Sequence, residues 1–191
     1  MVGNIPNFSK IDILRCFLRL NKSIGRKDLA RALELGEGTV RTILNTLKFN
    51  KLLDSTKRGH FLNKRGIEKL KEINECIGSP KSLIVQNIYP EFIKVGILIK
   101  NASDIRNLYK LRDIAVKNGA EGAIILKYEA KLYAPESDYE QDYKEIEKFF
   151  DFHDNDILVI AFSNKNRTAE IGAFAVAIEL STTLRKFINE L

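Results

Sequence analysis

The chain has 191 residues, of which 45% are hydrophobic and 29% charged, and it carries a net charge of +6 at pH 7. No run approaches the ~18 consecutive apolar residues of a membrane span, so the composition points to a globular rather than a membrane-embedded protein. The N-terminus lacks an apolar signal core, and Cys16 and Cys76 are predicted to be small buried hydrophobes rather than disulfide partners or metal ligands. We therefore expect a cytoplasmic protein.

The excess positive charge lies in the first part of the chain. Residues 1–79 contain 16 Lys and Arg against 8 Asp and Glu, a net charge of +8, whereas residues 80–191 contain 15 against 17, a net charge of −2. A basic domain is the electrostatic footprint of a protein that binds a polyanion. The charge changes sign beside Gly78-Ser79-Pro80, where a helix should end. These observations predict two domains, residues 1–79 and residues 80–191.

The first part of the chain is predicted to contain helices followed by a β-hairpin, from apolar residues at helical spacing and from glycine-containing turns. The expected helices are residues 10–20, 26–33, 38–49 and 64–76. The expected strands are residues 51–55 and 60–62, joined by a turn at residues 56–59. Asn63 is expected to cap the last of these helices.

The second part of the chain alternates strands and helices. The expected strands are residues 92–99, 123–128, 132–133 and 157–162. The expected helices are residues 103–118, 139–150 and 168–189, the first capped by Ser103 and ended by Gly119. This order indicates an α+β protein whose C-terminal domain is an α/β sandwich. A ferredoxin-like sheet with an added C-terminal helix is one arrangement that the order allows.

A short glycine-containing turn joins the second and third helices, which is the pattern of a helix-turn-helix motif. In the third helix, Val40, Ile43, Leu44 and Leu47 form an apolar stripe that should face the core. The polar remainder of the helix then faces outward, and the helix is predicted to enter the major groove of DNA. Taken alone, the same face also fits an ordinary solvated helix.

The outward residues of the third helix divide by their chemistry. Arg41, Thr42 and Asn45 are expected to contact base edges, because Arg reads guanine and Asn reads adenine through paired hydrogen bonds. Thr39 and Lys48 are expected to contact the phosphate backbone.

Four further cations lie outside this helix. Lys57 and Arg58 occupy the tip of the predicted hairpin, where they are expected to reach a minor groove or flanking phosphates. A solubilising edge hairpin is the alternative for this pair. Arg26 and Lys27, at the start of the second helix, are candidates for phosphate contacts.

Three segments of this region resemble the winged helix-turn-helix of bacterial and archaeal transcriptional regulators. They are residues 24–30, 38–44 and 59–66, and the resemblance covers about residues 8–76. In that family a Thr is usual where Asn63 stands, a small change at a cap. The resemblance implies a homodimer that binds an inverted repeat in double-stranded DNA.

The second part resembles an uncharacterised domain found behind such modules in archaeal proteins, at residues 111–120 and 122–126. That likeness implies no particular activity. We find no catalytic, nucleotide-binding or metal-ligand motif, and the two histidines, His60 and His153, fall in different predicted domains. We therefore expect neither an enzyme nor a resident cofactor or metal.

Two features of the second part are candidates for binding a small ligand. Asn164, Arg167 and Thr168 follow a predicted strand and lead into a helix, where backbone amides and the helix dipole favour an anion. Arg112 adds a charge on an earlier helix. The alternative for the first feature is a plain capped loop. For Arg112 it is a surface ion pair or a contact at the domain interface.

The last predicted helix is apolar on most sides over residues 169–184, so it is covered either within its own domain or by a second chain. Taken together, the sequence predicts a DNA-binding transcriptional regulator whose second domain dimerises or senses a small effector. The alternative is a winged-helix module that docks protein within a larger assembly.

Overall fold

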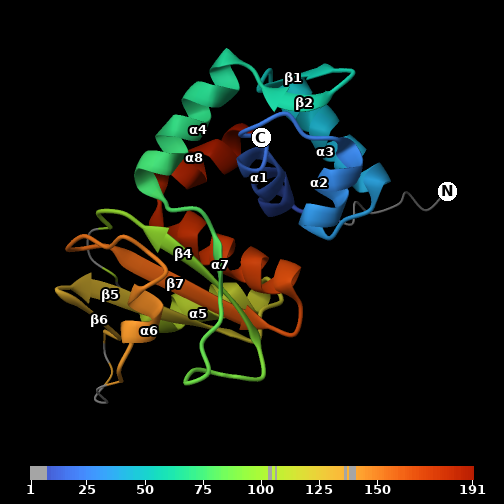
Figure 1. Ribbon diagram of the computed structural model, residues 1–191. Helices are drawn as coiled ribbons and strands as arrows, with labels where there is room; N and C mark the ends of the chain where they lie inside the picture. The colour runs from blue at the N-terminus through green and yellow to red at the C-terminus, as the bar shows by residue number, and fades with distance from the viewer. Residues whose placement is uncertain (1–7, 103–104, 106, 136, 138–140) are drawn as a thin grey trace. The chain divides into compact units, whose positions relative to one another are not determined.

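The computed structural model describes residues 8–102, 105, 107–135, 137 and 141–191. These residues divide into two compact units. Figure 1 shows the elements of both, with the colour running from blue at the N-terminus to red at the C-terminus. The first unit contains the chain through Glu72 together with Lys186–Leu191, and the second contains Ile73–Arg185. The division therefore falls within a helix, before the boundary expected after residue 79. The last residues join the first unit, which a boundary drawn from charge and turn residues does not reveal.

The first unit contains the helices and the hairpin that the sequence predicts. Its elements are α1 (Lys10–Leu18), α2 (Arg26–Leu33), α3 (Glu37–Phe49), β1 (Leu53–Thr56), β2 (Gly59–Leu62) and most of α4 (Lys64–Cys76). The Asn63 side chain accepts a hydrogen bond from the backbone N–H of Gly66 at 3.0 Å, so the predicted cap of α4 is confirmed. Buried leucine, isoleucine and phenylalanine side chains of α1, α2 and α3 form the core of this unit.

A third backbone segment joins the hairpin. The N–H of Ile24 donates to the carbonyl of His60 at 3.0 Å, and the N–H of His60 donates back to Ile24 at 2.9 Å. Gly59 is required beside this bridge, because its φ is +133° and a Cβ there would lie 2.6 Å from the Ile24 carbonyl oxygen. A single bridging residue produces no alternating pattern, so the sequence did not predict this pairing.

The prediction of one continuous helix over residues 168–189 is wrong. The structure has two helices there, α7 (Asn166–Leu180) and α8 (Thr182–Glu190), separated by Ser181 in an extended conformation. The Ser181 hydroxyl oxygen accepts a hydrogen bond from the N–H of Leu184 at 3.3 Å and so caps α8. The end of α8 packs on α1 in the first unit, where the rings of Phe187 and Phe17 lie 4.7 Å apart.

The second unit is built on one five-stranded sheet. Its strands are β3 (Lys81–Leu83), β4 (Ile93–Ile99), β5 (Gly122–Glu129), β6 (Lys131–Tyr133) and β7 (Ile157–Ser163). They lie in the order β3-β4-β7-β5-β6, and all neighbouring pairs are antiparallel. The strand β3 has only three residues and was not predicted, whereas the overall α+β class is confirmed.

The strand order differs from the ferredoxin-like arrangement that the element order allowed. In a ferredoxin-like sheet, the first and third strands of the repeat are adjacent and parallel. Here the corresponding strands, β4 and β6, are separated by β7 and β5. The last strand, β7, takes the central place and is buried along its whole length. Element order alone does not fix which strand becomes central, because that depends on tertiary packing.

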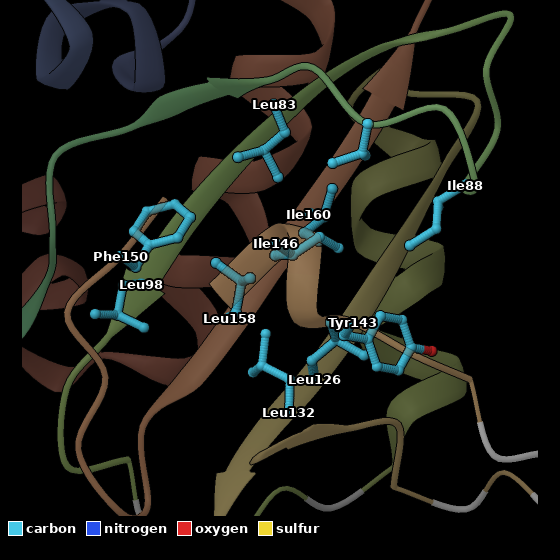
Figure 2. Packing of buried hydrophobic residues seen from close by; sticks show 11 residues of the cluster. Leu83, Ile88, Leu98, Leu126, Leu132, Tyr143, Ile146, Phe150, Leu158 and Ile160 are labelled. Carbon is cyan, nitrogen blue, oxygen red and sulfur yellow. The ribbon is translucent and has the colours of Figure 1, made fainter. Parts of the chain in front are cut away.

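Helices cover one face of this sheet and a hydrophobic cluster covers the other. The first face is packed by α7 and by α5 (Leu108–Lys117). On the other face, Leu98, Leu126 and Leu158 project from three neighbouring strands and meet Ile146 of α6 (Lys144–Glu147), as Figure 2 shows.

The apolar helix α7 is covered within its own unit, which decides between the two arrangements predicted for it. It packs against β4, β7 and α5. The approach is close, because a Cβ at Gly172 would lie 2.7 Å from the Cβ of Ala120, between α5 and β5, and 3.3 Å from the Cβ of Ala161 on β7. A second chain is therefore not needed to bury this helix.

Two predicted helices of the second unit are shorter than expected. The helix at residues 103–118 is observed as Leu108–Lys117, and its expected cap, Ser103, lies outside the described residues. Gly119 ends this helix with a φ of +94°, as predicted. The helix at residues 139–150 is observed only as α6, and Phe150 lies beyond its end, where it belongs to the hydrophobic cluster. Tyr139 lies outside the described residues.

Candidate nucleic-acid interface

The helix α3 presents one apolar face to the core and one polar face to solvent. Val40, Ile43, Leu44 and Leu47 are all buried, as their helical spacing predicts. The helix begins after Gly36, whose carbonyl accepts the N–H of Val40 at 3.0 Å. The face that α3 leaves to solvent is therefore fixed by the packing of its other face on α1 and α2.

The five residues predicted to contact DNA from α3 lie on its outer side. Arg41, Thr42, Asn45 and Lys48 are exposed, and Thr39 is half-buried. The Thr42 hydroxyl donates to the carbonyl of Gly38 at 3.2 Å, one turn earlier in the same helix. Its oxygen can still accept a hydrogen bond from a ligand, but its proton is directed to the helix backbone.

The N-terminal ends of α2 and α3 are joined by an ion pair. The Nε atom of Arg26 lies 3.3 Å from the Glu37 carboxylate, and both side chains are about half exposed. Glu37 is the only carboxylate on α3. Its pairing with Arg26 reduces the repulsion that it would exert on a phosphate, while Lys27 stays exposed beside it.

The two cations of the hairpin occupy the turn between β1 and β2. Lys57 and Arg58 are both exposed there. The N–H of Arg58 donates to the hydroxyl of Thr56 at 3.2 Å, and the carbonyl of Arg58 lies 3.5 Å from the Ser23 hydroxyl. These contacts hold the backbone of the turn and leave the two charged side chains in solvent.

Sequence reasoning missed His60, a residue of β2 that lies close enough to Arg26 of α2 and Lys48 of α3 to feel their charges. Its Nδ1 atom is 2.8 Å from the Ser55 hydroxyl across the β1–β2 pair. The pKa of His60 is lowered, chiefly by burial and further by the positive charges of Arg26 and Lys48. Arg26 of α2 and Lys48 of α3 therefore both disfavour a positive charge on the His60 side chain.

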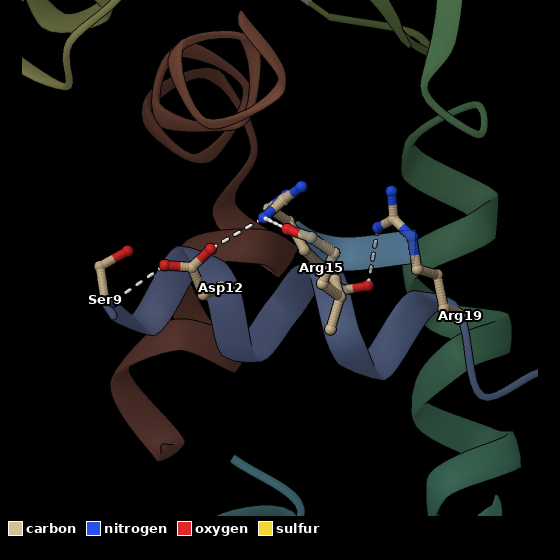
Figure 3. Close-up of polar contacts among 5 residues, drawn as sticks. Ser9, Asp12, Arg15 and Arg19 are labelled. Carbon is tan, nitrogen blue, oxygen red and sulfur yellow. Dashed lines mark hydrogen bonds and ion pairs between the residues drawn. The ribbon is translucent and has the colours of Figure 1, made fainter. Parts of the chain in front are cut away.

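A buried ion pair supports the helix that carries this interface. Arg15 and Asp12 of α1 lie 2.8 Å apart and are both buried, and the Asp12 carboxylate also accepts the N–H of Ser9 at 3.1 Å (Figure 3). The Arg15 guanidinium donates to the carbonyl of Leu33, the last residue of α2, at 3.2 Å. This contact ties α1 to the helix that precedes the turn into α3.

The structure does not gather the four predicted ligand-binding residues of the second unit around one point. Asn164 precedes α7, whereas Arg167 and Thr168 lie inside its first turn, because the helix begins earlier than predicted. The Thr168 methyl group faces Gly119, beyond the end of α5. Arg112, one turn after Tyr109, instead lies over the Tyr109 ring with its guanidinium carbon 6.0 Å from the ring centre.

The second unit contains a pocket that the sequence did not predict, between β6 and α6. It has a volume of about 750 Å³, and the residues lining it include Lys131, Tyr133, Tyr143, Lys144 and Glu147. The Glu147 carboxylate accepts the N–H of Leu132 at 2.6 Å, so this acid also holds the pocket wall. Burial raises the pKa of Tyr143, an effect that the nearby charge of Arg112 partly offsets.

Within the described ranges, no helix is long and apolar enough to cross a membrane. The same residues contain no group of three or more His, Cys, Asp or Glu side chains placed to hold a metal ion. Of the two cysteines, Cys16 is buried as predicted, and Cys76 is half-buried with its Sγ atom 3.2 Å from the Thr183 hydroxyl.

Comparisons with known proteins match each part of the chain to a family model. Residues 11–68 match the model described as PH0730-like, N-terminal domain, and residues 91–180 match a domain of unknown function, DUF4443. Among solved structures, the chain is similar to "Hypothetical protein PH0730 from Pyrococcus horikoshii OT3", with 28% identity and a TM-score of 0.78 over 94% of this chain and 99% of that one. A comparison with curated proteins gives no match.

Proposed function

We propose that this protein is a sequence-specific, double-stranded DNA-binding transcriptional regulator. The observation that carries the proposal is the outer face of α3, where Arg41, Asn45 and Lys48 are exposed opposite a fully buried apolar stripe. In helix-turn-helix proteins that bind DNA, the helix that follows the turn lies in the major groove with its outer face toward the bases. Its side chains include those that read guanine and adenine.

The charges around α3 support the same partner. Arg26 lies at the start of α2, and Lys57 and Arg58 lie at the tip of the hairpin. A central reading helix flanked by cations on two other elements matches a duplex, whose bases lie in a groove bounded by two phosphate backbones. The basic charge of residues 1–79 adds a long-range attraction that increases the association rate.

The test is selection of bound duplexes from a random pool, followed by affinity measurements on the selected sequence at several salt concentrations. Arg41→Ala and Asn45→Ala should relax the preference at one base position each, with a loss of about 1–3 kcal/mol per lost bidentate contact. Lys48→Ala should weaken binding to all sequences alike and reduce the salt slope by about one. Lys71→Ala, an exposed cation of α4, is the matched control.

An unchanged selected sequence with Arg41→Ala and Asn45→Ala would overturn the assignment of base contacts. The alternative function, protein docking through the same face of α3, makes a different prediction. A docking module would bind no duplex even at low salt, where contacts between cations and phosphates are strongest.

The proposal includes a homodimer on an inverted repeat, in which two α3 helices enter successive major grooves about 34 Å apart. Sedimentation of the chain alone and with the selected duplex tests it, since two protomers should bind one symmetric site. A complex of one protomer with an asymmetric site would contradict the proposed homodimer, whereas the proposal of DNA binding would stand.

We further propose that the second unit senses a small ligand, which changes the population of the DNA-binding form. The pocket of about 750 Å³ between β6 and α6 supports this role, because its volume suits a small molecule. Thermal unfolding with citrate, inorganic phosphate and nucleoside monophosphates as probes tests it. A probe that stabilises the wild type but not Tyr133→Ala, and that also changes DNA affinity, is the expected result.

A further inference from the structure

The outer face of α3 carries a large apolar side chain that the function proposed above does not use. Phe49, the last residue of α3, is 87% exposed, more than any other large hydrophobic residue that the structure describes. Isolated hydrophobic residues are common on protein surfaces, so exposure alone assigns no role. The position of Phe49 on the helix is what distinguishes it.

Phe49 lies at the centre of the exposed face. At about 100° per residue, it points within about 20° of Thr42 and about 40° of Asn45. The mean direction of the buried stripe is about 170° away from Phe49, nearly the opposite side of the helix. The side chain thus points as directly away from the core as any position of α3 allows, on the same side of the helix as Thr42 and Asn45.

The charges beside Phe49 indicate what covers it. Arg41 and Lys48 lie about 80–100° to one side of it around the helix. The only carboxylate of α3, Glu37, is at the other end of the helix and is paired with Arg26. An apolar protein surface would have to desolvate these cations without compensation, whereas a nucleic acid places phosphates beside them.

We propose that Phe49 contacts the 5-methyl group of a thymine in the major groove and thereby contributes to sequence specificity. Thymine alone among the four bases presents an apolar methyl group there, and Phe is among the side chains that pack on it. Phe49 lies about 12 Å along the helix axis from Arg41, which corresponds to three or four base pairs where the helix follows the groove. The inference rests on the proposed function, and it predicts a thymine within the DNA sequence that the protein recognises.

The experiment uses the full chain and a duplex selected from a random pool, in which each thymine is replaced in turn by deoxyuridine. Deoxyuridine lacks only the 5-methyl group. For the wild type, one replacement should weaken binding about fourfold, the value expected for losing one buried methyl contact. Phe49→Ala should bind the thymine duplex less tightly and lose no further affinity on that replacement.

Two variants control the comparison. Phe49→Leu keeps an apolar side chain and should retain sensitivity to the methyl group. Tyr109→Ala removes an exposed aromatic side chain from the second unit and should behave as the wild type. Because Phe49 is exposed, Phe49→Ala should unfold thermally at the wild-type temperature, which separates a binding effect from misfolding.

Three kinds of result would overturn the inference, and only the last of them would also overturn the proposed function. If no thymine is sensitive, or Phe49→Ala keeps the sensitivity, Phe49 reads no methyl group, while duplex binding leaves the proposed function standing. If Phe49→Ala changes the sedimentation coefficient and not the base preference, the side chain belongs to a contact between copies of the chain. If the wild type binds no duplex at low salt, the proposed function fails and this inference fails with it.

Discussion

The Arg15 guanidinium lies 2.8 Å from the Asp12 carboxylate, and both side chains are buried in the first unit. Because Arg15 also donates to the carbonyl of Leu33, the pair fixes α1 against the end of α2. Ion pairs of this kind add little net stability over apolar residues of the same size, but removing one partner leaves a buried charge. We therefore expect a large loss of stability when one partner is removed, although the intact pair itself contributes little.

Asp12→Ala should lower the free energy of unfolding by about 3–5 kcal/mol, because Arg15 then stays buried without this carboxylate. Urea unfolding followed by circular dichroism measures the effect. The matched control is Asp28→Ala, which breaks another Asp–Arg pair three residues apart, but with both side chains exposed. That loss should not exceed about 1 kcal/mol. Equal losses in the two variants would contradict the structural role of the buried pair.

Two glycines in the first unit should respond oppositely to the same substitution. A Cβ at Gly66 would lie 2.1 Å from the Leu52 carbonyl oxygen, whereas a Cβ at Gly38 would meet nothing within 4 Å. Gly66→Ala should therefore lower the free energy of unfolding by about 1–3 kcal/mol through overpacking. Gly38→Ala should raise it by about 0.5–1 kcal/mol, because Ala restricts the unfolded chain and favours the helix. A stabilised Gly66→Ala would show that Leu52 moves away freely.

The parts of the fold that depend on helical period were predictable from the sequence. The apolar stripe from Val40 to Leu47 fixed which side of α3 faces solvent, and Asn63 and Gly119 marked two helix ends correctly. Such signals are local, because they need only the spacing of residues along one element. For the same reason, most of the predicted DNA-facing side chains are exposed where they were expected.

The missed features depend on contacts between distant segments. Ile24 joins the hairpin through a single bridge to His60, which brings that side chain near Arg26 and Lys48. The central place of β7 follows from packing on both faces of the sheet. Phe49 was overlooked for a different reason, since a hydrophobic residue at a helix end is ordinarily assigned to the core.

Cys16 should be unreactive in the folded protein. Burial raises its pKa to about 12, although Arg19 and Arg15 act in the opposite direction, so almost no thiolate forms at pH 8. Iodoacetamide treatment followed by peptide mass spectrometry should leave Cys16 unmodified in buffer and modify it in 6 M guanidinium chloride, a condition chosen to unfold typical domains. Rapid modification in buffer would mean that α1 opens locally at low cost.

The pH dependence of DNA binding should depend on His60. Burial, Arg26 and Lys48 lower its pKa below the ordinary value of about 6.5, so the side chain is neutral at pH 7. A DNA phosphate close to His60 would favour the protonated form. Affinity for DNA should therefore rise as the pH falls toward the lowered pKa, by roughly three- to tenfold for one added charge.

The same protonation opposes folding, because a group whose folded pKa lies below its unfolded pKa makes the folded state less stable as the pH falls through that interval. Acidification should thus strengthen DNA binding while it weakens the fold. Because protonation of carboxylates acts in the same two directions, a comparison of histidine variants is needed to identify the titrating group. His60→Gln should remove both trends. His153→Gln, which changes the other histidine of the chain, should preserve them. Titrations from pH 7.5 to about 5.5 decide the matter, and identical profiles for the wild type and His60→Gln would exclude His60 as the titrating group.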